Sequence, residues 1–174
     1  MKKYLKIKEW NIIEDQFHPD RQRMSESICS VGNGRFGQRG YFEEPYSSDS
    51  YRGSFVAGIT FLDKTRVGWW KNGFPPYYTR IPKAADWSRI NLRLIDEELD
   101  LAGWDVDSFN RRLDMKEGIF YRDMEVTSPR GNQLRIHVAH ITNMARPNLC
   151  LIKYIVSSIN YTCRISLVPI LDDN

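Results

Sequence analysis

Residues 27–41 read SICSVGNGRFGQRGY, and this glycine-rich stretch decides how the rest of the chain is interpreted. Gly32, Gly34 and Gly37 have the G-x-G-x-x-G spacing of a dinucleotide-binding turn, which requires a helix that opens at the last glycine. Gly40 and Pro45 stand where that helix would continue. Glycine costs about 1 kcal/mol and proline about 3 kcal/mol in a helix interior, so the nucleotide interpretation conflicts with its required context.

The same stretch contains Asn33-Gly34, the strongest short-range signal for a β-hairpin, because a type I′ turn needs positive φ at both central residues. We therefore predict a hairpin over residues 24–41 with its turn at Asn33-Gly34. The glycine-rich loop of a kinase is also a hairpin, but it requires a lysine-bearing V-A-I-K strand downstream. No such strand follows in this chain.

Short alternating runs separated by turn signals fill the remainder of the sequence. We expect an edge strand within residues 6–14 and an apolar strand at residues 55–62. Three strand pairs are predicted: 90–95 with 99–101, 119–127 with 134–138, and 148–157 with 161–168. Residues 148–157 are apolar on both faces, which is typical of a strand inside a sandwich. No stretch keeps helical periodicity over three turns, so the predicted fold is all-β, an antiparallel β-sandwich.

Composition and charge limit the classes of partner. The 174 residues suit one domain, and the net charge of +3 is spread along the chain. We therefore expect no nucleic-acid partner, and no run is long and apolar enough to span a membrane. The basic start lacks the apolar segment of a signal peptide, so a cytoplasmic location is expected.

No cofactor and no metal site are expected. The three cysteines, Cys29, Cys150 and Cys163, are widely spaced without a C-x-x-C motif, which argues against a disulfide framework or a zinc site. Each is expected to be a small buried residue. His137 and His140 are three apart on a predicted strand, so they should point to opposite faces and cannot form a metal pair.

Two kinds of residue remain as candidates for a site. Glycoside hydrolysis uses two carboxylates, but the acidic clusters of this chain lie in predicted turns and are expected to be solvated. Those clusters are Glu43-Glu44, Asp96-Glu97-Glu98 and Asp105 with Asp107. The second candidate is the aromatic segment 67–78, predicted to be a loop or distorted hairpin, which contains Trp69, Trp70, Phe74, Tyr77 and Tyr78. We expect it to cover a core edge or contact another domain, and the alternative is a surface for stacking sugar rings.

The order of several motifs resembles the amino-terminal domain of glycoside hydrolase family 65, whose members include maltose, trehalose and kojibiose phosphorylases. In chain order the motifs are WNIIE at 10–14, ESICSVGNGRFGQRG at 26–40, GSFVAGI at 53–59, Asp86-Trp87, LDMKEG at 113–118 and Leu171-Asp172. The second motif is the most specific. The residues of its hairpin that match the family are Gly32, Asn33, Gly34, Gly37, Arg39 and Gly40.

The resemblance implies a large sandwich, of the kind called a supersandwich, joined in family members to an (α/α)6 catalytic barrel. Residues 1–174 would then be a truncated amino-terminal sandwich domain without that barrel. The family's general-acid glutamate and phosphate-binding loops lie in the barrel, so no catalytic residue and no cofactor-binding or metal-binding residue is placed on this chain. Full-length members act on α-linked glucose disaccharides, either with inorganic phosphate as co-substrate to give glucose 1-phosphate or with water.

The chain alone is therefore expected to be non-catalytic and to support the active-site rim or the interface of a homodimer. The disaccharide substrate would be bound through the missing catalytic domain. The alternative is a stand-alone carbohydrate-binding module in which sugars stack on Trp69, Trp70, Tyr77 and Tyr78.

Overall fold

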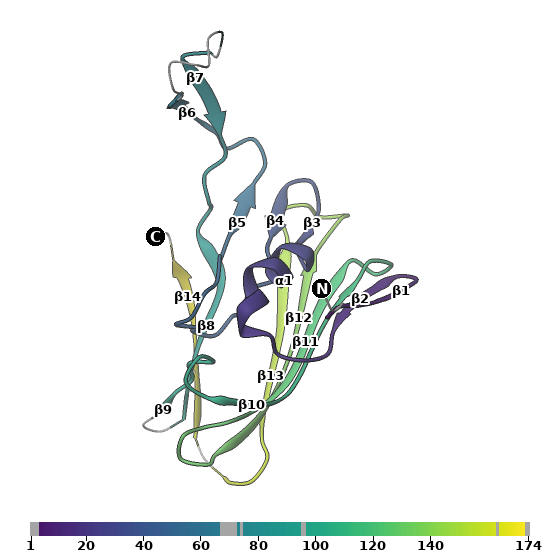
Figure 1. The fold of residues 1–174 in the computed structure, drawn as a ribbon, viewed down its shortest axis with the longest axis vertical. Coiled ribbons are helices and arrows are strands. Elements are labelled where there is room, and N and C mark those ends of the chain that lie inside the picture. The colour runs from purple at the N-terminus through teal and green to yellow at the C-terminus, as the bar shows by residue number, and fades with distance from the viewer. Residues whose placement is uncertain (1–3, 67–72, 74, 95–96, 163, 173–174) are drawn as a thin grey trace.

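The computed structural model describes residues 4–66, 73, 75–94, 97–162 and 164–172. Antiparallel strands dominate this part of the chain (Figure 1). The largest sheet has six strands in the order β1-β2-β10-β11-β12-β13. Their bounds are Lys6–Lys8, Asn11–Glu14, Asp105–Asp114, Ile119–Thr127, Gln133–Thr142 and Cys150–Ser158.

Three smaller sheets complete the described strands, in the orders β14-β8-β9, β3-β4-β5 and β6-β7. Their bounds, in chain order, are Val31–Gly32 (β3), Phe36–Gln38 (β4), Ser54–Val56 (β5), Phe61–Lys64 (β6), Tyr77–Arg80 (β7), Asp86–Leu94 (β8), Glu97–Glu98 (β9) and Ile165–Asp172 (β14). A 3-10 turn, η1 at Pro19–Arg21, leads into helix α1 at Gln22–Ile28. No helix in the described residues is long and apolar enough to cross a membrane.

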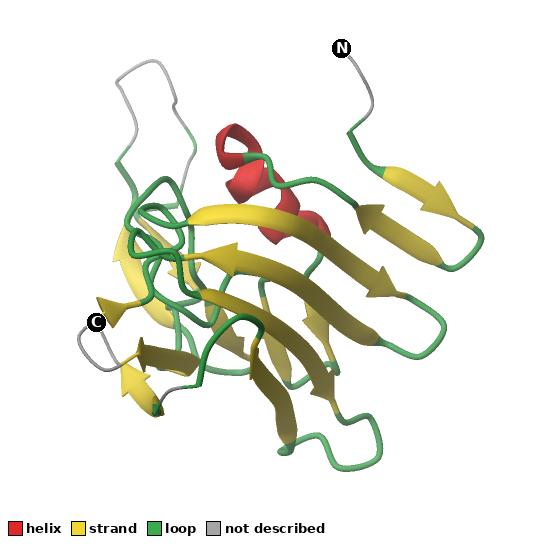
Figure 2. Cartoon of the chain, turned by 90° about the horizontal axis from the view of Figure 1, so that it is seen from below, coloured by secondary structure: helices red, strands yellow, loops and turns green. Residues whose placement is uncertain are grey.

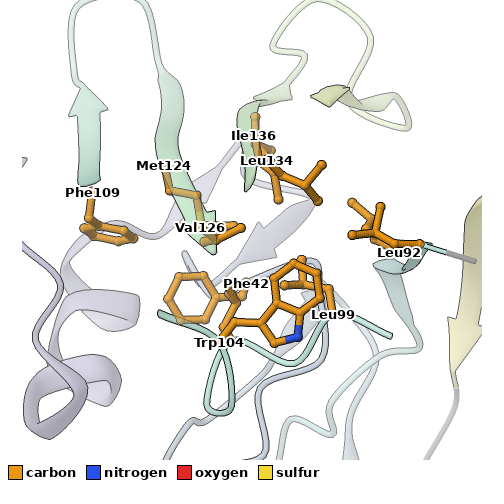
Figure 3. Close-up of a cluster of buried hydrophobic side chains, with 12 residues drawn as sticks. Phe42, Leu92, Leu99, Trp104, Phe109, Met124, Val126, Leu134 and Ile136 are labelled. Carbon is orange, nitrogen blue, oxygen red and sulfur yellow. The ribbon is translucent and has the colours of Figure 1, made fainter. Parts of the chain in front are cut away.

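The six-stranded sheet and the β14-β8-β9 sheet pack face to face around the main core. Figure 3 shows Leu92 and Leu99 on one side of this core and Leu134, Ile136 and Val126 on the other. These side chains are 0% exposed, and burying each stabilises the fold by roughly 1.5–3 kcal/mol relative to leaving it in water. The alternation that brings Leu134 and Ile136 to one face is the period-two pattern of a strand. The predicted all-β sandwich is confirmed.

A second, smaller core lies where the chain after α1 crosses the six-stranded sheet. Cys29 and Val31 pack there on Leu113 and Phe120, with Ile12 at the margin. Figure 2 shows α1 lying alongside the large sheet. The glycine-rich stretch therefore belongs to a layer that covers one end of the sheet.

The prediction that the hairpin starts at residue 24 is wrong, because residues 22–28 form α1 and the hairpin begins at Val31. Pro19 favours this helical start, since its fixed φ suits the first turn of a helix. The helix has seven residues, so it is too short to show the three-turn periodicity by which a helix is recognised in a sequence.

The apolar run at residues 55–62 is two strands rather than one. Strand β5 ends at Val56, the chain turns at Ala57-Gly58, and β6 starts at Phe61. Gly58 has φ of +82°, which suits a turn and not a strand. The expected edge strand in residues 6–14 is likewise two short strands, β1 and β2, and β1 does form the edge of the large sheet.

The predicted pair 119–127 with 134–138 is confirmed as β11 and β12. The predicted pair 90–95 with 99–101 is correct in its first strand only, because the partner strand is β9 at Glu97–Glu98, residues that the prediction placed in a turn. Leu99 N, just after β9, donates to Leu92 O. The third pair is wrong. Strand β13 pairs with β12, and β14 crosses to the other sheet and pairs with β8. Strand β13 is also an edge strand of the described sheet, with its outward Leu151 and Ile155 exposed. The prediction that β13 lies in the interior of the sandwich, made from apolar residues on both of its faces, is therefore wrong.

Candidate functional site

The family-like hairpin at residues 31–38 is present, but its turn is shifted by one residue from the prediction. Val31 pairs with Gln38 and Gly32 with Gly37, and Asn33 N donates to Phe36 O over 3.0 Å. Gly34 and Arg35 are therefore the central residues of the turn. Gly34 has φ of +82°, so it meets the demand for positive φ at the first central position.

Asn33 stands at the corner of the turn and ties the hairpin to another part of the chain. Its side-chain Oδ1 accepts hydrogen bonds from the backbone N–H groups of Arg35 and Phe36. Its Nδ2 donates to the carbonyls of Asn143 and Pro147, at 2.9 and 3.1 Å, in the connection between β12 and β13. The asparagine thus supports the turn and docks it on the large sheet.

Glu26 and Arg39 join α1, the hairpin and residues 50–51 into one unit. The fully buried Glu26 carboxylate accepts from Ser50 Oγ and from Tyr51 N. Arg39 donates to the Tyr51 and Arg23 carbonyls and to Ser27 Oγ, and its guanidinium lies 3.8 Å from Glu26. Because all three guanidinium nitrogens of Arg39 are engaged inside the chain, the motif arginine acts as a structural clamp.

The motif glycines fall into two groups. A Cβ on Gly40 would lie 2.7 Å from the Cys29 carbonyl oxygen, and one on Gly32 would lie 2.9 Å from the Phe36 carbonyl oxygen. These two positions need glycine because another backbone approaches closely. A Cβ on Gly37 would meet nothing within 4 Å, so no contact inside the described chain requires glycine there.

Glu43 and Glu44 were predicted to lie in a solvated turn, and this prediction is wrong. Both are 0% exposed. The guanidinium of Arg122, also fully buried, donates to Glu43 and to both carboxylate oxygens of Glu44. Tyr154 OH donates to Glu44, and His140 Nε2 lies 2.5 Å from Glu43 Oε1. We call these five residues the buried charge cluster.

Electrostatics favours the charged forms of Glu43 and Arg122 within the buried charge cluster. Burial by itself would raise the pKa of Glu43, but the attraction of Arg122 and His140 outweighs it and lowers the pKa to about 2. Burial would lower the pKa of Arg122, whereas Glu44 and Glu43 together raise it. Burial, and then the nearby Glu44 carboxylate, raise the pKa of Tyr154 well above its ordinary value, so its hydroxyl stays protonated.

A second buried ion pair lies next to this cluster. Arg111 Nη2 donates to Gln22 Oε1 over 2.7 Å, and Arg111 Nη1 lies 3.4 Å from Glu14 Oε2. Burial lowers the pKa of Arg111 despite Glu14, and burial raises the pKa of Glu14 despite Arg111. The Phe42 ring lies between the two systems, 5.0 Å from the Arg111 guanidinium carbon and 5.2 Å from that of Arg122.

Sequence reasoning missed this pair of arginines although a signal was present. Arg122 occupies an inward position of β11, in the same alternation as Phe120, Met124 and Val126. Arg111 similarly stands between Phe109 and Leu113 on β10. A charged residue at an inward strand position indicates a buried partner, because an isolated buried charge is too costly.

The buried charge cluster resembles catalytic chemistry only in its residue types. A carboxylate pair, a histidine and a tyrosine converge there, yet Glu43, Glu44 and Arg122 are 0% exposed, so a substrate has no access to them. His137 faces the opposite side of β12, where it contacts Asp123. Among the described residues, no three His, Cys, Asp or Glu side chains are placed to hold a metal ion. Cys29 is buried, Cys150 is partly buried, and Cys163 lies outside the described residues.

The predicted aromatic site lies on the hairpin β6–β7, which projects from the rest of the molecule (Figure 1). We call this hairpin the arm. Tyr77 is 56% and Tyr78 46% exposed. They are adjacent on β7, so they point to opposite faces of the arm, and Tyr78 OH donates to Asp63 on one of those faces. Trp69, Trp70 and Phe74 lie outside the described residues.

Comparison with known proteins gives one consistent result. The family model for the N-terminal domain of glycosyl hydrolase family 65 matches residues 12–174. The maltose phosphorylase of Bacillus subtilis (strain 168) is 40% identical over 168 residues, which are 97% of this chain and 22% of that protein. The alpha,alpha-trehalose phosphorylase of Thermoanaerobacter brockii is 30% identical over 171 residues, with the same two coverages of 97% and 22%.

A solved structure from the human microbiome, assigned as a kojibiose phosphorylase, has the same fold. It superposes with a TM-score of 0.80 at 26% identity, over 89% of this chain and 20% of that one. The chain thus spans about a fifth of the length of the proteins it matches.

Proposed function

The chain belongs to glycosyl hydrolase family 65, as an amino-terminal domain, and we propose that it is the non-catalytic sandwich portion of an enzyme that acts on α-linked glucose disaccharides. The names of its relatives, maltose phosphorylase and alpha,alpha-trehalose phosphorylase, support this substrate class. The catalytic (α/α)6 barrel would lie in the remaining four fifths of such a protein.

The proposed reaction of the whole enzyme is phosphorolysis, with inorganic phosphate as co-substrate and glucose 1-phosphate as product. Hydrolysis is the alternative within the same family. Maltose is the first substrate to test, because the maltose phosphorylase relative is the more similar of the two at 40% identity.

One observation carries the proposal that this domain supports a larger enzyme: apolar side chains on the core-facing side of the sandwich are left uncovered. Leu167 on β14 pairs with Leu92 on β8, so both point toward the space between the sheets. Leu92 is 0% exposed, whereas Leu167 is 44% exposed, and Leu171, at the register shift of β14, is 74% exposed. Apolar side chains at such positions fit a surface that packs on further protein.

The arm supports the same proposal. A two-stranded hairpin is marginally stable in water on its own, and this one exposes Leu62 by 72% and Tyr77 by 56% on one face. We propose that this face contacts the barrel at the rim of the active site or the second subunit of a homodimer. Either contact would bury aromatic and apolar area that is costly to leave in water.

The test is to express the full-length gene product and to measure release of glucose 1-phosphate. Maltose, trehalose, kojibiose and nigerose are compared with and without inorganic phosphate, and the 174-residue chain serves as the matched control. We expect phosphate-dependent release from one of these disaccharides by the full-length protein and none by the chain alone. Turnover by the chain alone, or a full-length product that leaves all four sugars intact, would contradict the proposal.

The competing function is a stand-alone carbohydrate-binding module, favoured by the exposed rings of the arm. Tyr77 and Tyr78 point to opposite faces of the arm, so each would contribute to a separate stacking surface. This alternative predicts that substitutions on the arm abolish binding of a glucose disaccharide by the isolated chain.

A further inference from the structure

A large cavity of the described chain lies away from the arm, at one end of the sandwich. It has a volume of about 750 Å³ and is bounded by residues 15–19, 46–48 and 101–109. We call it the end cavity. Loops gathered at the end of a β-sandwich are a common place for binding sites, because the sheets hold them in fixed positions.

The floor of the end cavity is aromatic. Phe17 lies with its ring centroid 5.5 Å from that of Phe109 and 6.2 Å from that of Tyr46. Trp104 and Phe109 also belong to the main core, so the floor is fixed by packing (Figure 3). An apolar floor of this kind suits the C–H face of a sugar ring.

The walls are acidic and hydroxylic. Asp105, Asp107 and Ser108 line the cavity, and so does Asp15 from another segment of the chain. Asp107 accepts a hydrogen bond from Thr127 Oγ1, whereas Asp105 has no partner among the described residues. The Lys6 ammonium, through its hydrogen bond to the carboxylate, lowers the pKa of Asp15.

A β-bulge builds this wall. The register between β10 and β11 shifts between Val106 and Ser108, so Asp107 is an extra residue. Val106 and Phe109 would face opposite sides of a regular strand, and the bulge turns both toward the core while consecutive residues 105–108 line the cavity. Bulges re-aim side chains in this way next to functional sites.

One polar atom in the end cavity lacks a partner. The hydroxyl oxygen of Tyr46 is buried and makes no hydrogen bond, although burying an unpaired hydroxyl costs about 1–3 kcal/mol. The oxygen is shielded from solvent in the free chain, so a ligand hydroxyl supplies the missing partner only when the side chains around Tyr46 rearrange on binding.

The chemistry of the lining selects the class of ligand. None of the described lining residues is basic, so a phosphorylated sugar would be repelled by the carboxylates. Among the described residues no three acidic, histidine or cysteine side chains are placed to hold a metal ion, so a metal cation would lack a ligand set in this cavity. A neutral ligand with many hydroxyl groups fits this lining, because its hydroxyls can donate hydrogen bonds to the carboxylates while its apolar face lies on the aromatic floor.

We propose that the end cavity binds an uncharged α-linked glucose disaccharide. The choice of sugar rests on the proposed function, whereas the neutral, hydroxyl-rich class of ligand rests on the cavity itself. Asp107 and Asp105 accept hydrogen bonds from ring hydroxyls, Tyr46 supplies its free hydroxyl, and the ring face lies on the aromatic floor.

Calorimetric titration of the chain with maltose tests this assignment, with glucose 1-phosphate and calcium chloride as the competing ligands. We expect saturable binding of maltose and none of the other two. Asp107→Asn should lower the affinity for maltose about tenfold, which is the effect of losing one hydrogen bond to a charged group. Binding of calcium or of glucose 1-phosphate in preference to maltose would overturn the proposal.

Tyr46→Phe is the sharper variant, because it removes an atom that has no partner in the free chain. Maltose affinity should fall several-fold while the stability of the free chain is unchanged or rises, which a purely structural role would not produce. Tyr78→Phe on the arm is the matched control and should leave affinity unchanged.

If Tyr78→Phe lowers the affinity for maltose and Tyr46→Phe does not, the sugar binds to the arm and its assignment to the end cavity is wrong. A chain that binds no maltose also overturns this inference, yet it leaves the proposed function intact if the full-length enzyme phosphorolyses maltose. A full-length protein without activity would contradict the proposed function independently of this titration.

Discussion

The buried charge cluster and the arm reverse the usual distribution of residue types. Glu43, Glu44 and Arg122 carry charges and are 0% exposed, whereas Leu62 and Tyr77 are apolar and more than half exposed. Charges are buried only where their partners are complete. Large apolar side chains are left exposed together where another surface covers them.

The buried charge cluster stabilises the fold of the chain itself, whereas the arm offers a surface for contact with further protein. The cluster joins residues 43–44 to strands β11, β12 and β13, so it connects the layers of the sandwich. The arm pairs only with itself among the described strands. Substitutions should therefore change folding in the first region and association in the second.

The largest effect is expected for Arg122→Ala. The change leaves two carboxylates buried without their cation, which costs about 3–5 kcal/mol of the free energy of unfolding. Urea denaturation followed by circular dichroism measures it. Arg135→Ala is the control, because Arg135 pairs with Glu125 on the exposed face and such surface pairs contribute about 0–1 kcal/mol.

A double substitution separates charge from packing at this site. Glu43→Gln with Glu44→Gln in the Arg122→Ala background removes the unpaired charges, so it should recover part of the lost stability. If the triple variant is no more stable than Arg122→Ala, the arginine acts by filling space and the electrostatic account of the cluster is wrong.

The second prediction concerns the loss of folding stability at low pH. The pKa of Glu43 is about 2 in the folded chain against an ordinary 4.5. A lowered folded pKa means that the ionised carboxyl stabilises the fold above about pH 4.5 and that this contribution is lost as the pH falls toward 2. The loss is on the order of 3 kcal/mol.

Urea titrations between pH 7 and pH 2 compare the wild type with Glu43→Gln. The variant should be less stable at pH 7, and the difference should shrink through the window from 4.5 to 2. Added salt should not reproduce the loss, because buried pairs are screened little. A constant difference across this window would show that the charge of Glu43 does not stabilise the fold.

The third prediction concerns the glycine-rich stretch that joins the cluster to the rest of the chain. Gly40→Ala places a Cβ 2.7 Å from a backbone oxygen, so we expect a loss of about 1–3 kcal/mol of unfolding free energy. Gly37→Ala is the matched control, since nothing lies within 4 Å of its Cβ and its φ is not positive. Equal losses would mean that close approach at Gly40 does not explain this glycine.

The sequence allowed the sandwich and the hairpin to be predicted because both depend on local patterns. Alternation in β11 and β12 identifies the buried face, and Gly34 marks the turn within one residue. The partner of β13 was not predictable in this way. A strand with apolar residues on both faces carries no information on which neighbour it joins, so the nearest strand along the chain was the wrong choice.

The charged cluster shows a different limit. Glu43 and Glu44 lie between two turn-rich segments, and their own neighbours give no sign of burial. Their partner Arg122 is 78 residues from Glu44 along the chain, so only the inward position of Arg122 on β11 indicated a buried acid. For the arm, the exposure of Tyr77 and Tyr78 is set by the absence of any strand packed on β6 and β7 in the described chain.

The smallest effect on folding is expected on the arm. Leu62→Ser with Tyr77→Ser changes only exposed side chains, so the free energy of unfolding of the chain should stay within about 0.5 kcal/mol of wild type. Ile7→Ser, at a side chain that is 76% exposed on β1, is the control for a general loss of surface apolar area.

The same arm variant in the full-length gene product should have a large effect if the arm contacts the barrel or a second subunit. Sedimentation velocity would show a shift from dimer to monomer in the second case, and disaccharide turnover would fall with the dimer intact in the first. The Ile7→Ser control should change neither. If the arm variant instead destabilises the isolated chain by more than about 1 kcal/mol, the exposed side chains already stabilise the fold of the chain itself, and the contrast between arm and buried cluster does not hold.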